Sequence, residues 1–329
     1  MRRIPILLAA LLLNGCGGIQ SVMSPAGDEA AALHDLLLLS VAVCGAIYLL
    51  VMGGLGWSLW RRRGATVPAL TGEEPALDRS LWVAAAVILA GLTILTVGSF
   101  LADRALFAAR GSEALQVRVT GHQYWWRIEY RDPATGRWIE TANELHLPQG
   151  RTARVALGSA DVIHSFWVPN VAGKIDMVPG RRNLIDLTPR RLGWFRGQCS
   201  EYCGTQHAHM AFDVKVDSPP AFDAWLAAQA RPASPAPDPI AAQGASVFAG
   251  PCAACHAVRG TDAGGRAGPD LTHFASRRSI AAGTLPMTRG NVQAWIAQPQ
   301  ALKPGVPMPA VPLSPKDADA VAHYLATLR

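Results

Sequence analysis

The chain has 329 residues, of which 50% are hydrophobic and only 16% are charged, and its formal net charge is +6. This length allows two or three domains. The small share of charged residues is unusual for a soluble protein and indicates membrane segments. The modest positive charge is typical of ordinary surface charge. Because no run of Lys and Arg alternates with aromatic residues, we expect no nucleic-acid partner.

The first residues have the pattern of a secretory signal peptide. Met1-Arg-Arg precedes an apolar run and then a small-residue segment, and we assign residues 1–21 to this leader. Leu13-Asn14-Gly15-Cys16 also has the form of a bacterial lipoprotein cleavage site, so Cys16 is a candidate lipid anchor at the start of the mature chain. Cleavage near Gly17, which would discard Cys16, is the alternative.

Residues 22–110 contain two longer apolar runs, at about 36–60 and 81–101. Each is long enough to span a bilayer as a helix, so we predict a transmembrane hairpin. Arg61-Arg62-Arg63 follows the first run, and the positive-inside rule then places the connecting loop in the cytoplasm and the remainder of the chain outside the bacterial inner membrane. The loop also carries acids that we interpret as solvated charge: Glu73, Glu74 and Asp78.

Residues 111–220 contain short β-rich runs separated by turn residues, which favours a β-sandwich. The predicted strands are 116–119, 125–130, 154–157, 162–168, 183–187 and 211–216. A helix over 221–230 and a stiff Pro-rich segment over 231–239 form the predicted linker, residues 221–239, which tethers the last domain and raises its effective concentration at the sandwich.

Residues 240–329 have an all-helical pattern. The predicted helices are 241–249, 289–297 and 314–328, the last with Ser314 as its N-terminal cap. The predicted fold class is therefore multidomain, with a two-helix transmembrane hairpin, a Greek-key β-sandwich and a small all-α domain.

The densest group of metal-binding side chains lies in residues 199–210, which contain Cys199, Glu201, Cys203, His207 and Met210. Thiolate and thioether sulfur together with imidazole suit copper, and a copper site of this kind shuttles electrons. Zinc held by the two cysteines, the histidine and a fourth ligand is the alternative. A thioether would be an unusual ligand for zinc.

A second metal signature is Cys252-Ala-Ala-Cys255-His256, which is the attachment sequence of a c-type haem. Both thiols add to the haem, and His256 is placed to bind the iron. A thioredoxin-like dithiol would not need this histidine and would require a βαβ context. Met308 is the predicted sixth ligand, with Met287 and His273 as competitors, because a thioether favours a high reduction potential.

The six cysteines do not predict a structural disulfide. Two pairs have metal-ligand spacing, and oxidation would remove those ligands. Cys16 and Cys44 lie in apolar N-terminal segments, and we assign Cys44 a packing role.

Four motifs in chain order resemble subunit II of cytochrome c oxidase. They are Gly121-His-Gln-Tyr-Trp-Trp126, Asp161-Val-Ile-His164-Ser-Phe-Trp-Val-Pro169, Lys174-Ile-Asp-Met-Val-Pro-Gly-Arg181 and the segment 199–210. A helical hairpin before a cupredoxin β-sandwich fits the same family. Residues 244–328 resemble a small cytochrome c, because Gly244, Phe248, Gly268-Pro-Asp-Leu271, Trp295 and the Met308 loop stand in that family's order. The fusion resembles the caa-type haem–copper oxidases of bacteria.

The resemblance implies a binuclear copper centre, called CuA, in which Cys199 and Cys203 bridge two copper ions. The implied ligands are His164, Cys199, the main-chain carbonyl of Glu201, Cys203, His207 and Met210. The Glu201 carboxylate is expected to reach a magnesium ion at the boundary with the catalytic subunit. Electrons are expected to enter through one ring of an aromatic patch formed by Tyr124, Trp125 and Trp126. Which ring accepts them is open, since many relatives have tryptophan where this chain has Tyr124.

The function implied by the resemblance is that of subunit II in a proton-translocating terminal oxidase. Electrons from cytochrome c or an upstream complex would pass through the chain's own haem and the copper pair to subunit I, where oxygen is reduced to water and protons are pumped. The implied partners are subunit I, other oxidase subunits, the external donor and membrane lipid. A copper-containing subunit of a nitric oxide reductase and a membrane-anchored copper-binding protein are the alternatives, although the latter would not need a haem.

Overall fold

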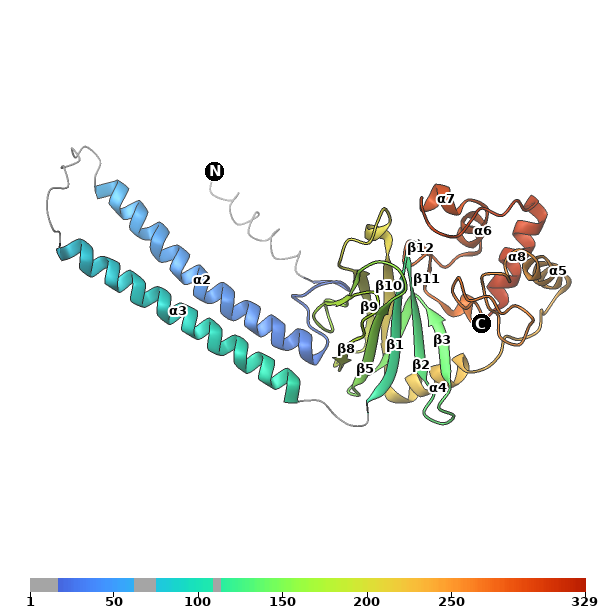
Figure 1. The fold of residues 1–329 in the computed structure, drawn as a ribbon, viewed down its shortest axis with the longest axis horizontal. Helices are drawn as coiled ribbons and strands as arrows, with labels where there is room; N and C mark the ends of the chain where they lie inside the picture. The colour runs from blue at the N-terminus through green and yellow to red at the C-terminus, as the bar shows by residue number, and fades with distance from the viewer. Residues whose placement is uncertain (1–16, 62–74, 109–113) are drawn as a thin grey trace, which may run out of the picture. The chain divides into compact units, whose positions relative to one another are not determined.

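A computed structural model of the chain describes residues 17–61, 75–108 and 114–329 (Figure 1). The chain divides into one compact unit of residues 31–110 and a second that holds the remainder. The predicted lipid anchor Cys16 and the acids Glu73 and Glu74 lie outside the described residues.

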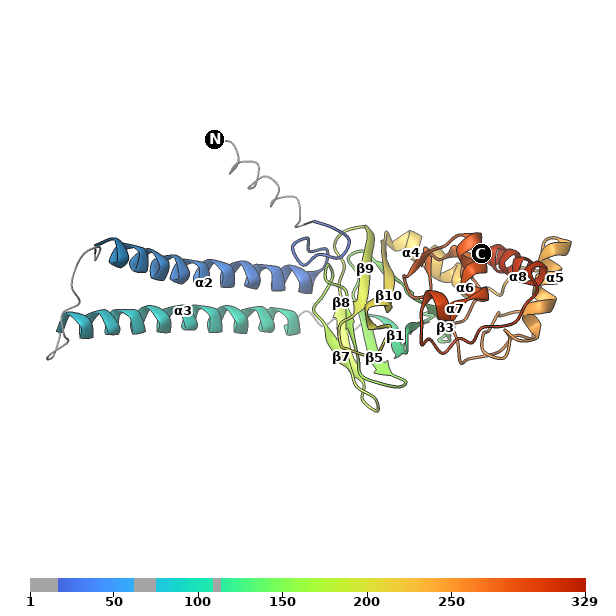
Figure 2. The ribbon, with the colours of Figure 1, turned by 90° about the horizontal axis from the view of Figure 1, so that it is seen from above.

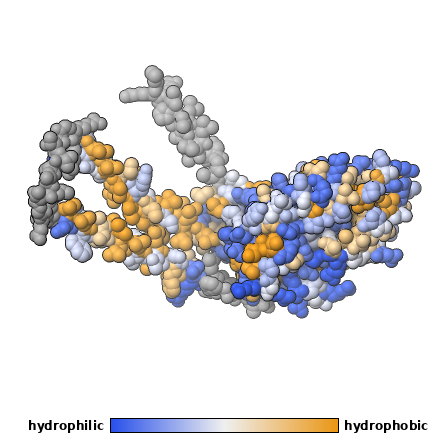
Figure 3. Space-filling view, turned by 45° about the horizontal axis from the view of Figure 1, so that its top comes forward, coloured by the Kyte–Doolittle hydropathy of each residue, from blue (hydrophilic) through white to orange (hydrophobic). Residues whose placement is uncertain are grey.

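Two long helices, α2 (Asp28–Arg61) and α3 (Pro75–Ala108), account for the predicted hairpin. Both are long and apolar enough to cross a membrane, and most of their visible surface is hydrophobic (Figure 3). Each helix extends beyond the predicted apolar run into its polar flanks, where the acidic first turn of α2 is favourable for the helix dipole. A β-carbon at Gly98 would lie 2.6 Å from Leu39 Cδ2, so this glycine lets the two helices approach closely.

Residues 114–229, here called the sandwich domain, form two five-stranded sheets with the orders β3-β2-β1-β5-β8 and β4-β10-β9-β6-β7 (Figure 2). The first sheet contains β1 (Leu115–His122), β2 (Trp125–Arg131), β3 (Trp138–Ala142), β5 (Ala153–Ser159) and β8 (Asn183–Leu187). The second contains β4 (Glu144–Pro148), β6 (His164–Trp167), β7 (Ile175–Met177), β9 (Gly193–Cys199) and β10 (Ala211–Asp217). Helix α4 (Pro219–Gln229) follows, and its Phe222 and Leu226 belong to the sandwich core. The β-sandwich prediction is confirmed, although β3, β4, β7 and β9 were not predicted.

Burial alternates along β1 and β2, because one face of the first sheet packs against the second sheet. Trp126, Phe166 and Phe212 fill the space between the sheets, with ring centroids 5.1 to 6.2 Å apart. The chain changes sheets at Asn143, which has a positive φ of 60°. Its side-chain oxygen accepts a hydrogen bond from Trp126 N (2.8 Å), and its carbonyl accepts one from Asp213 N, so this residue fastens both sheets at their corner.

Residues 239–329, here called the C-terminal domain, are helical as predicted. They contain α5 (Pro239–Ala249), α6 (Arg289–Ala297), α7 (Pro299–Leu302), α8 (Pro315–Thr327) and a short hairpin of β11 (Ser279–Ile280) and β12 (Leu285–Pro286). Ser314 caps α8 by accepting a hydrogen bond from Asp317 N, as the sequence predicts. Helix α5 crosses α8 where Gly244 meets the backbone of Ala320.

The segment that joins the two domains lies along the C-terminal domain. Ala233 N donates to Arg259 O at 2.8 Å, and His273 Nε2 donates to Arg231 O at 3.0 Å. At the other end of the second unit, Asn170 donates hydrogen bonds to the carbonyls of Gly18 and Ser24. Gly18 belongs to the range predicted as leader, so residues just after Cys16 contact the sandwich domain.

Candidate metal centres

The donor groups predicted for copper converge at one end of the second sheet. His164 is the first residue of β6, and Cys199 is the last residue of β9, which pairs with β6. Cys199 Sγ lies 3.8 Å from His164 Nδ1 and 3.8 Å from Cys203 Sγ. These three side chains form a buried cluster whose ligand atoms all lie within 4.8 Å of one another.

The loop between β9 and β10 brings the other predicted donors to the same place. Cys203 Sγ lies 3.7 Å from His207 Nδ1 and 3.8 Å from Met210 Sδ. The carbonyl oxygen of Glu201 is 3.2 Å from Cys199 Sγ. All the groups predicted as copper ligands are therefore gathered around the two sulfurs.

Gly204 makes the turn of this loop possible. Its φ is +127°, and a β-carbon there would lie 2.4 Å from the hydroxyl of Tyr124. The loop is also held by Gln123, whose side-chain amide donates to Cys203 O at 2.6 Å. The β1–β2 turn therefore shapes the loop that carries the donors.

The geometry of the sulfur pair fits metal binding. A separation of 3.8 Å between Cys199 Sγ and Cys203 Sγ is too long for a disulfide, whose sulfurs lie about 2.0 Å apart. It is shorter than twice a metal–thiolate bond of about 2.3 Å, so one metal ion can contact both sulfurs. Two thiolates, two imidazoles and a thioether form a soft donor set that suits copper.

The electrostatics of the cluster favour a bound cation. The Cys203 thiol and the His164 ring both stabilise the Cys199 thiolate and lower the pKa of Cys199 to about 3, against the effect of burial. The neighbouring Cys199 thiolate and burial together raise the pKa of Cys203. The second thiol therefore loses its proton readily only when positive charge is supplied between the sulfurs.

His164 is oriented by a carboxylate. Its Nε2 donates to Asp161 at 2.7 Å, which leaves Nδ1 facing Cys199. Carboxylates that orient metal-binding histidines in this way are common around metal sites. Asp161 also accepts a hydrogen bond from Gln123 N at 2.7 Å, so the carboxylate is fixed from a second side.

The side chains of Glu201 and His209, in the same loop, are not gathered around the two sulfurs. Among the described residues, no hydrogen bond or ion pair involves the Glu201 carboxylate, and its main chain alone contributes to the cluster. His209 is exposed, and its ring hydrogen-bonds Gln206 Oε1 at 2.9 Å.

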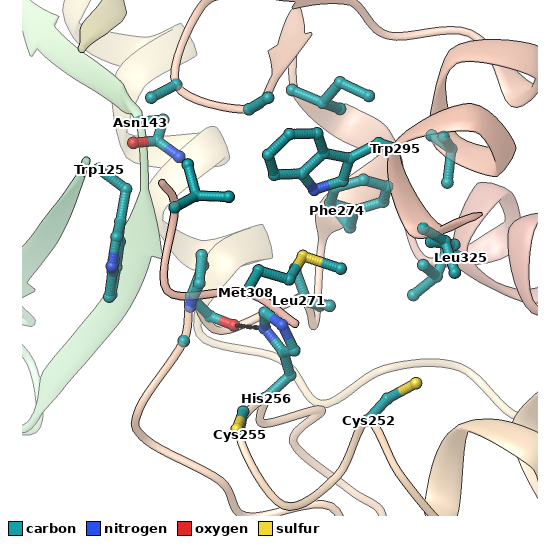
Figure 4. Close-up of a pocket in the computed structure, with 18 of the residues that line it drawn as sticks. Trp125, Asn143, Cys252, Cys255, His256, Leu271, Phe274, Trp295, Met308 and Leu325 are labelled. Atoms are coloured by element: carbon teal, nitrogen blue, oxygen red, sulfur yellow. Dashed lines mark hydrogen bonds between the residues drawn. The ribbon is translucent and has the colours of Figure 1, made fainter. Parts of the chain in front are cut away.

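The residues predicted for haem line a single pocket (Figure 4). It includes Cys252, Cys255, His256 and Met308. His256 Nδ1 donates to Pro269 O at 2.8 Å, so Nε2 is left for a ligand. Gly268 keeps the space beside this ring open, because a β-carbon there would lie 2.6 Å from His256 Cε1.

The three candidates for a second axial ligand are placed differently. The Met308 side chain lies over His256 in the view of Figure 4 and lines the same pocket. Met287 packs against the core of the C-terminal domain. His273 is engaged by its hydrogen bond to Arg231 O. This arrangement favours Met308.

Arg277 belongs to the same pocket and was not predicted from the sequence. Its guanidinium is buried and donates to Asp270 O, while its Nε has no hydrogen-bond partner among the described residues. Burial lowers its pKa. A buried cation with an unused donor suits a ligand that carries carboxylates, as haem does. The surrounding sequence, Ser276-Arg-Arg-Ser279, carries no local signal of this placement.

The three aromatic residues of the predicted patch have different surroundings. Trp126 is completely buried in the sandwich core. Trp125 and Tyr124 line the pocket that contains His256 and Met308. Trp125 stacks on His122 at 4.5 Å, and the hydroxyl of Tyr124 lies 3.3 Å from Thr205 Oγ1 in the loop of the sulfur pair.

The order of the parts in the chain defines the class of protein. Two apolar helices precede a cupredoxin-like sandwich with this donor loop, and a cytochrome c domain follows it. This is the order of a membrane-anchored electron-transfer subunit with copper and haem. Residues 132–217 match the family described as cytochrome C oxidase subunit II, periplasmic domain, and residues 241–329 match the family cytochrome c.

Two relatives match this chain over nearly their whole length. Cytochrome c oxidase subunit 2 of Alkalihalophilus pseudofirmus is 34% identical over 100% of this chain and 97% of its own length. The protein of that name from Bacillus subtilis is 32% identical over 98% of this chain and 96% of its own. The crystal structure of the periplasmic domain of subunit II of cytochrome oxidase of Bradyrhizobium japonicum shares 32% identity over 35% of this chain and 92% of that chain, with a TM-score of 0.33. The chain belongs to the cytochrome c oxidase subunit 2 family.

Proposed function

We propose that this chain is subunit II of a bacterial terminal oxidase. It accepts electrons at its own c-type haem and passes them through a binuclear copper centre to a haem–copper subunit I, which reduces oxygen to water and pumps protons. The observation that supports the proposal is that the sulfur pair and the pocket of His256 belong to one compact unit, in which Tyr124 lines that pocket and also reaches Thr205 in the loop of the sulfur pair.

In the proposed copper centre, Cys199, Cys203, His164 and His207 would hold two copper ions, with Met210 and the carbonyl of Glu201 as further donors. When bound, the copper pair and the haem each supply reversible one-electron chemistry. The fixed sulfur pair and the carboxylate on His164 limit how far these ligands move when the charge changes.

In the proposed haem site, the Cys252 and Cys255 thiols would hold the group, and His256 and Met308 would bind its iron. The Pro269 carbonyl fixes the His256 ring by accepting a hydrogen bond from its Nδ1. The Arg277 guanidinium provides positive charge inside the pocket.

Tyr124 and Trp125 are the proposed rings through which electrons reach the copper site. Both line the haem pocket, and Tyr124 also reaches Thr205, two residues after Cys203. Trp126 has a packing role instead, because it is sealed in the core. The aromatic patch is thus divided between transfer and folding.

We further propose that α2 and α3 anchor the chain in the bacterial inner membrane, with both metal domains on the periplasmic side. Acylation of Cys16 would add a lipid anchor. Subunit I, other oxidase subunits and an external donor such as cytochrome c are the proposed partners. The Glu201 carboxylate is the proposed ligand of an interfacial magnesium ion, because its side chain is left free by the sulfur cluster.

The test is to purify the chain with its co-expressed large subunit and measure oxygen uptake with a reduced donor. Uptake that is lost when Cys199 is replaced by Ser supports the proposal. Reduction of nitric oxide without oxygen uptake would instead identify the nitric oxide reductase. Purification of the chain alone, with copper but no haem, would favour the copper-binding protein.

A further inference from the structure

Lys303 is one of the largest fully buried side chains in the described residues, with 1% of its surface exposed. It follows helix α7 and stands five residues before Met308. Lysine is almost never buried so completely without a partner of opposite charge. Within residues 17–61, 75–108 and 114–329, however, Lys303 forms no ion pair with a carboxylate.

Three backbone carbonyls surround its ammonium group instead. Lys303 Nζ donates to His209 O at 2.7 Å, to Ala281 O at 2.9 Å and to Tyr124 O at 3.2 Å. An ammonium has three protons, so its donor capacity is filled. His209 and Tyr124 belong to the sandwich domain, whereas Ala281 and Lys303 itself belong to the C-terminal domain.

Other hydrogen bonds cross between the domains around this lysine. Gln206 Nε2 donates to Pro304 O at 2.8 Å, and Ala211 N donates to Ala282 O at 3.1 Å. The Arg196 guanidinium donates to Gly283 O at 3.3 Å. On the sandwich side, the residues Gln206, His209 and Ala211 surround the proposed copper ligands His207 and Met210 in sequence.

The hydrogen bonds therefore connect two ligand loops directly. The segment 303–308 holds the proposed haem ligand Met308, and the segment 206–211 holds two proposed copper ligands. Lys303 also lines the pocket that contains His256. Burial lowers the pKa of Lys303 to about 7.

We propose that Lys303 is a positioning residue that fixes the loop of the haem ligand against the loop of the copper ligands, so that the C-terminal domain is docked at one distance from the copper site. This inference rests on the proposed function for the identity of the two metals. Because the hydrogen bonds around Lys303 join the domains directly, we expect the domains to stay docked when the linker is cut.

The test uses the full chain in detergent, with a specific protease site in place of residues 234–237 of the linker. After cleavage, we expect the two fragments of the parent chain to sediment together and haem-to-copper electron transfer after photoreduction to continue. In Lys303→Met, a larger share of the cut fragments should separate than in the parent chain, and transfer in the uncut chain should slow by about tenfold or more, because small displacements between reacting groups have large effects on rate. The paramagnetic spectrum of the copper site should also change, since the loop that carries its ligands loses the hydrogen bond from Lys303 to His209 O.

Lys316→Met is the matched control, because Lys316 is an exposed lysine of the same domain on helix α8. It should leave sedimentation, transfer rate and spectrum as in the parent chain. Arg196→Met removes the hydrogen bonds to Gly283 O and so weakens the interface between the domains from the sandwich side. If the Lys303 variant does not accumulate, the same measurements on this variant test the proposal.

The outcomes separate the two proposals. If the parent chain binds both metals, and neither Lys303→Met nor Arg196→Met differs from the control, the role of Lys303 is refuted while the proposed function stands. If the parent chain binds no copper or no haem, the proposed function itself fails.

Discussion

Close packing of α5 on α8 can be tested with a matched pair of glycine substitutions in the C-terminal domain. A β-carbon at Gly244 would lie 2.0 Å from Ala320 O and 2.6 Å from Ala320 C. Both are backbone atoms of α8, so the strain cannot be relieved by turning a side chain. The two helices must separate by about an ångström or more to reach an ordinary van der Waals distance. Because α5 leads directly into Cys252, this movement also shifts the proposed haem attachment site.

The expected magnitude follows from two opposing effects. Alanine is favoured over glycine inside a helix by about 1 kcal/mol, whereas overpacking against a fixed neighbour costs about 1–3 kcal/mol and occasionally more. Since the obstacle here is backbone, we expect Gly244→Ala to lower the free energy of unfolding by about 2 kcal/mol or more. Gly290, in α6, has nothing within 4 Å of the same position, so Gly290→Ala should be neutral or stabilise by up to about 1 kcal/mol.

The assay is a denaturant titration of the full chain in detergent, followed by the absorbance of the haem in the C-terminal domain. The midpoint of Gly244→Ala should fall while that of Gly290→Ala stays or rises. Equal midpoints for the two variants would refute the close contact between α5 and α8.

Three further predictions concern the charged core and the two metal sites. Burial lowers the pKa of His146, but its hydrogen bonds to two buried carboxylates outweigh this effect and raise the pKa above 6.5. The contribution of protonated His146 to stability is therefore fully present below pH 6.5 and is lost as the pH rises through the folded-state pKa. We expect His146→Asn to lower the free energy of unfolding by about 3 kcal/mol at pH 6 and by less at pH 8, measured by denaturation. An equal loss at both pH values would contradict the raised pKa of His146. Cys199→Ser should abolish the binuclear copper signal in metal analysis and paramagnetic spectra, whereas Cys44→Ser, exposed on α2, should retain it; copper retained in both variants would refute the role of the sulfur pair. Met308→Leu should lower the reduction potential of the haem in a redox titration, because the thioether favours the reduced iron, while Met287→Leu should not; the opposite result would reassign the ligand.

Local motifs predicted most of the proposed donors because these are concentrated in two short segments, whereas His164 and Met308 lie outside them. Cys199, Cys203, His207 and Met210 lie within twelve residues, and the haem cysteines adjoin His256. The alternation of β2 also explains the aromatic patch, since Trp126 shares its face with the buried Ile128 and Tyr130.

Two features that the sequence did not predict depend on long-range contacts. Lys303 meets Tyr124 across 179 positions, and Arg277 becomes a pocket residue only when the C-terminal domain folds around it. Strand β4 was missed because two of its buried residues are polar, Glu144 and His146, which form a hydrogen-bonded pair in the interior.

Strand β9 was not predicted because glycines interrupt its strand pattern. A β-carbon at Gly197 would lie 2.1 Å from Phe212 Cζ, so this glycine provides the space for a core ring in the adjacent strand. A glycine in a strand usually weakens the pattern of a strand, and here only the three-dimensional packing explains it.

The most direct test of the proposed electron-transfer role is elemental analysis of the purified full chain together with its paramagnetic spectrum. We predict two copper ions and one haem iron per polypeptide, with a spectrum in which one unpaired electron is shared by both coppers. Zinc bound at Cys199 and Cys203 in place of copper would contradict the proposal.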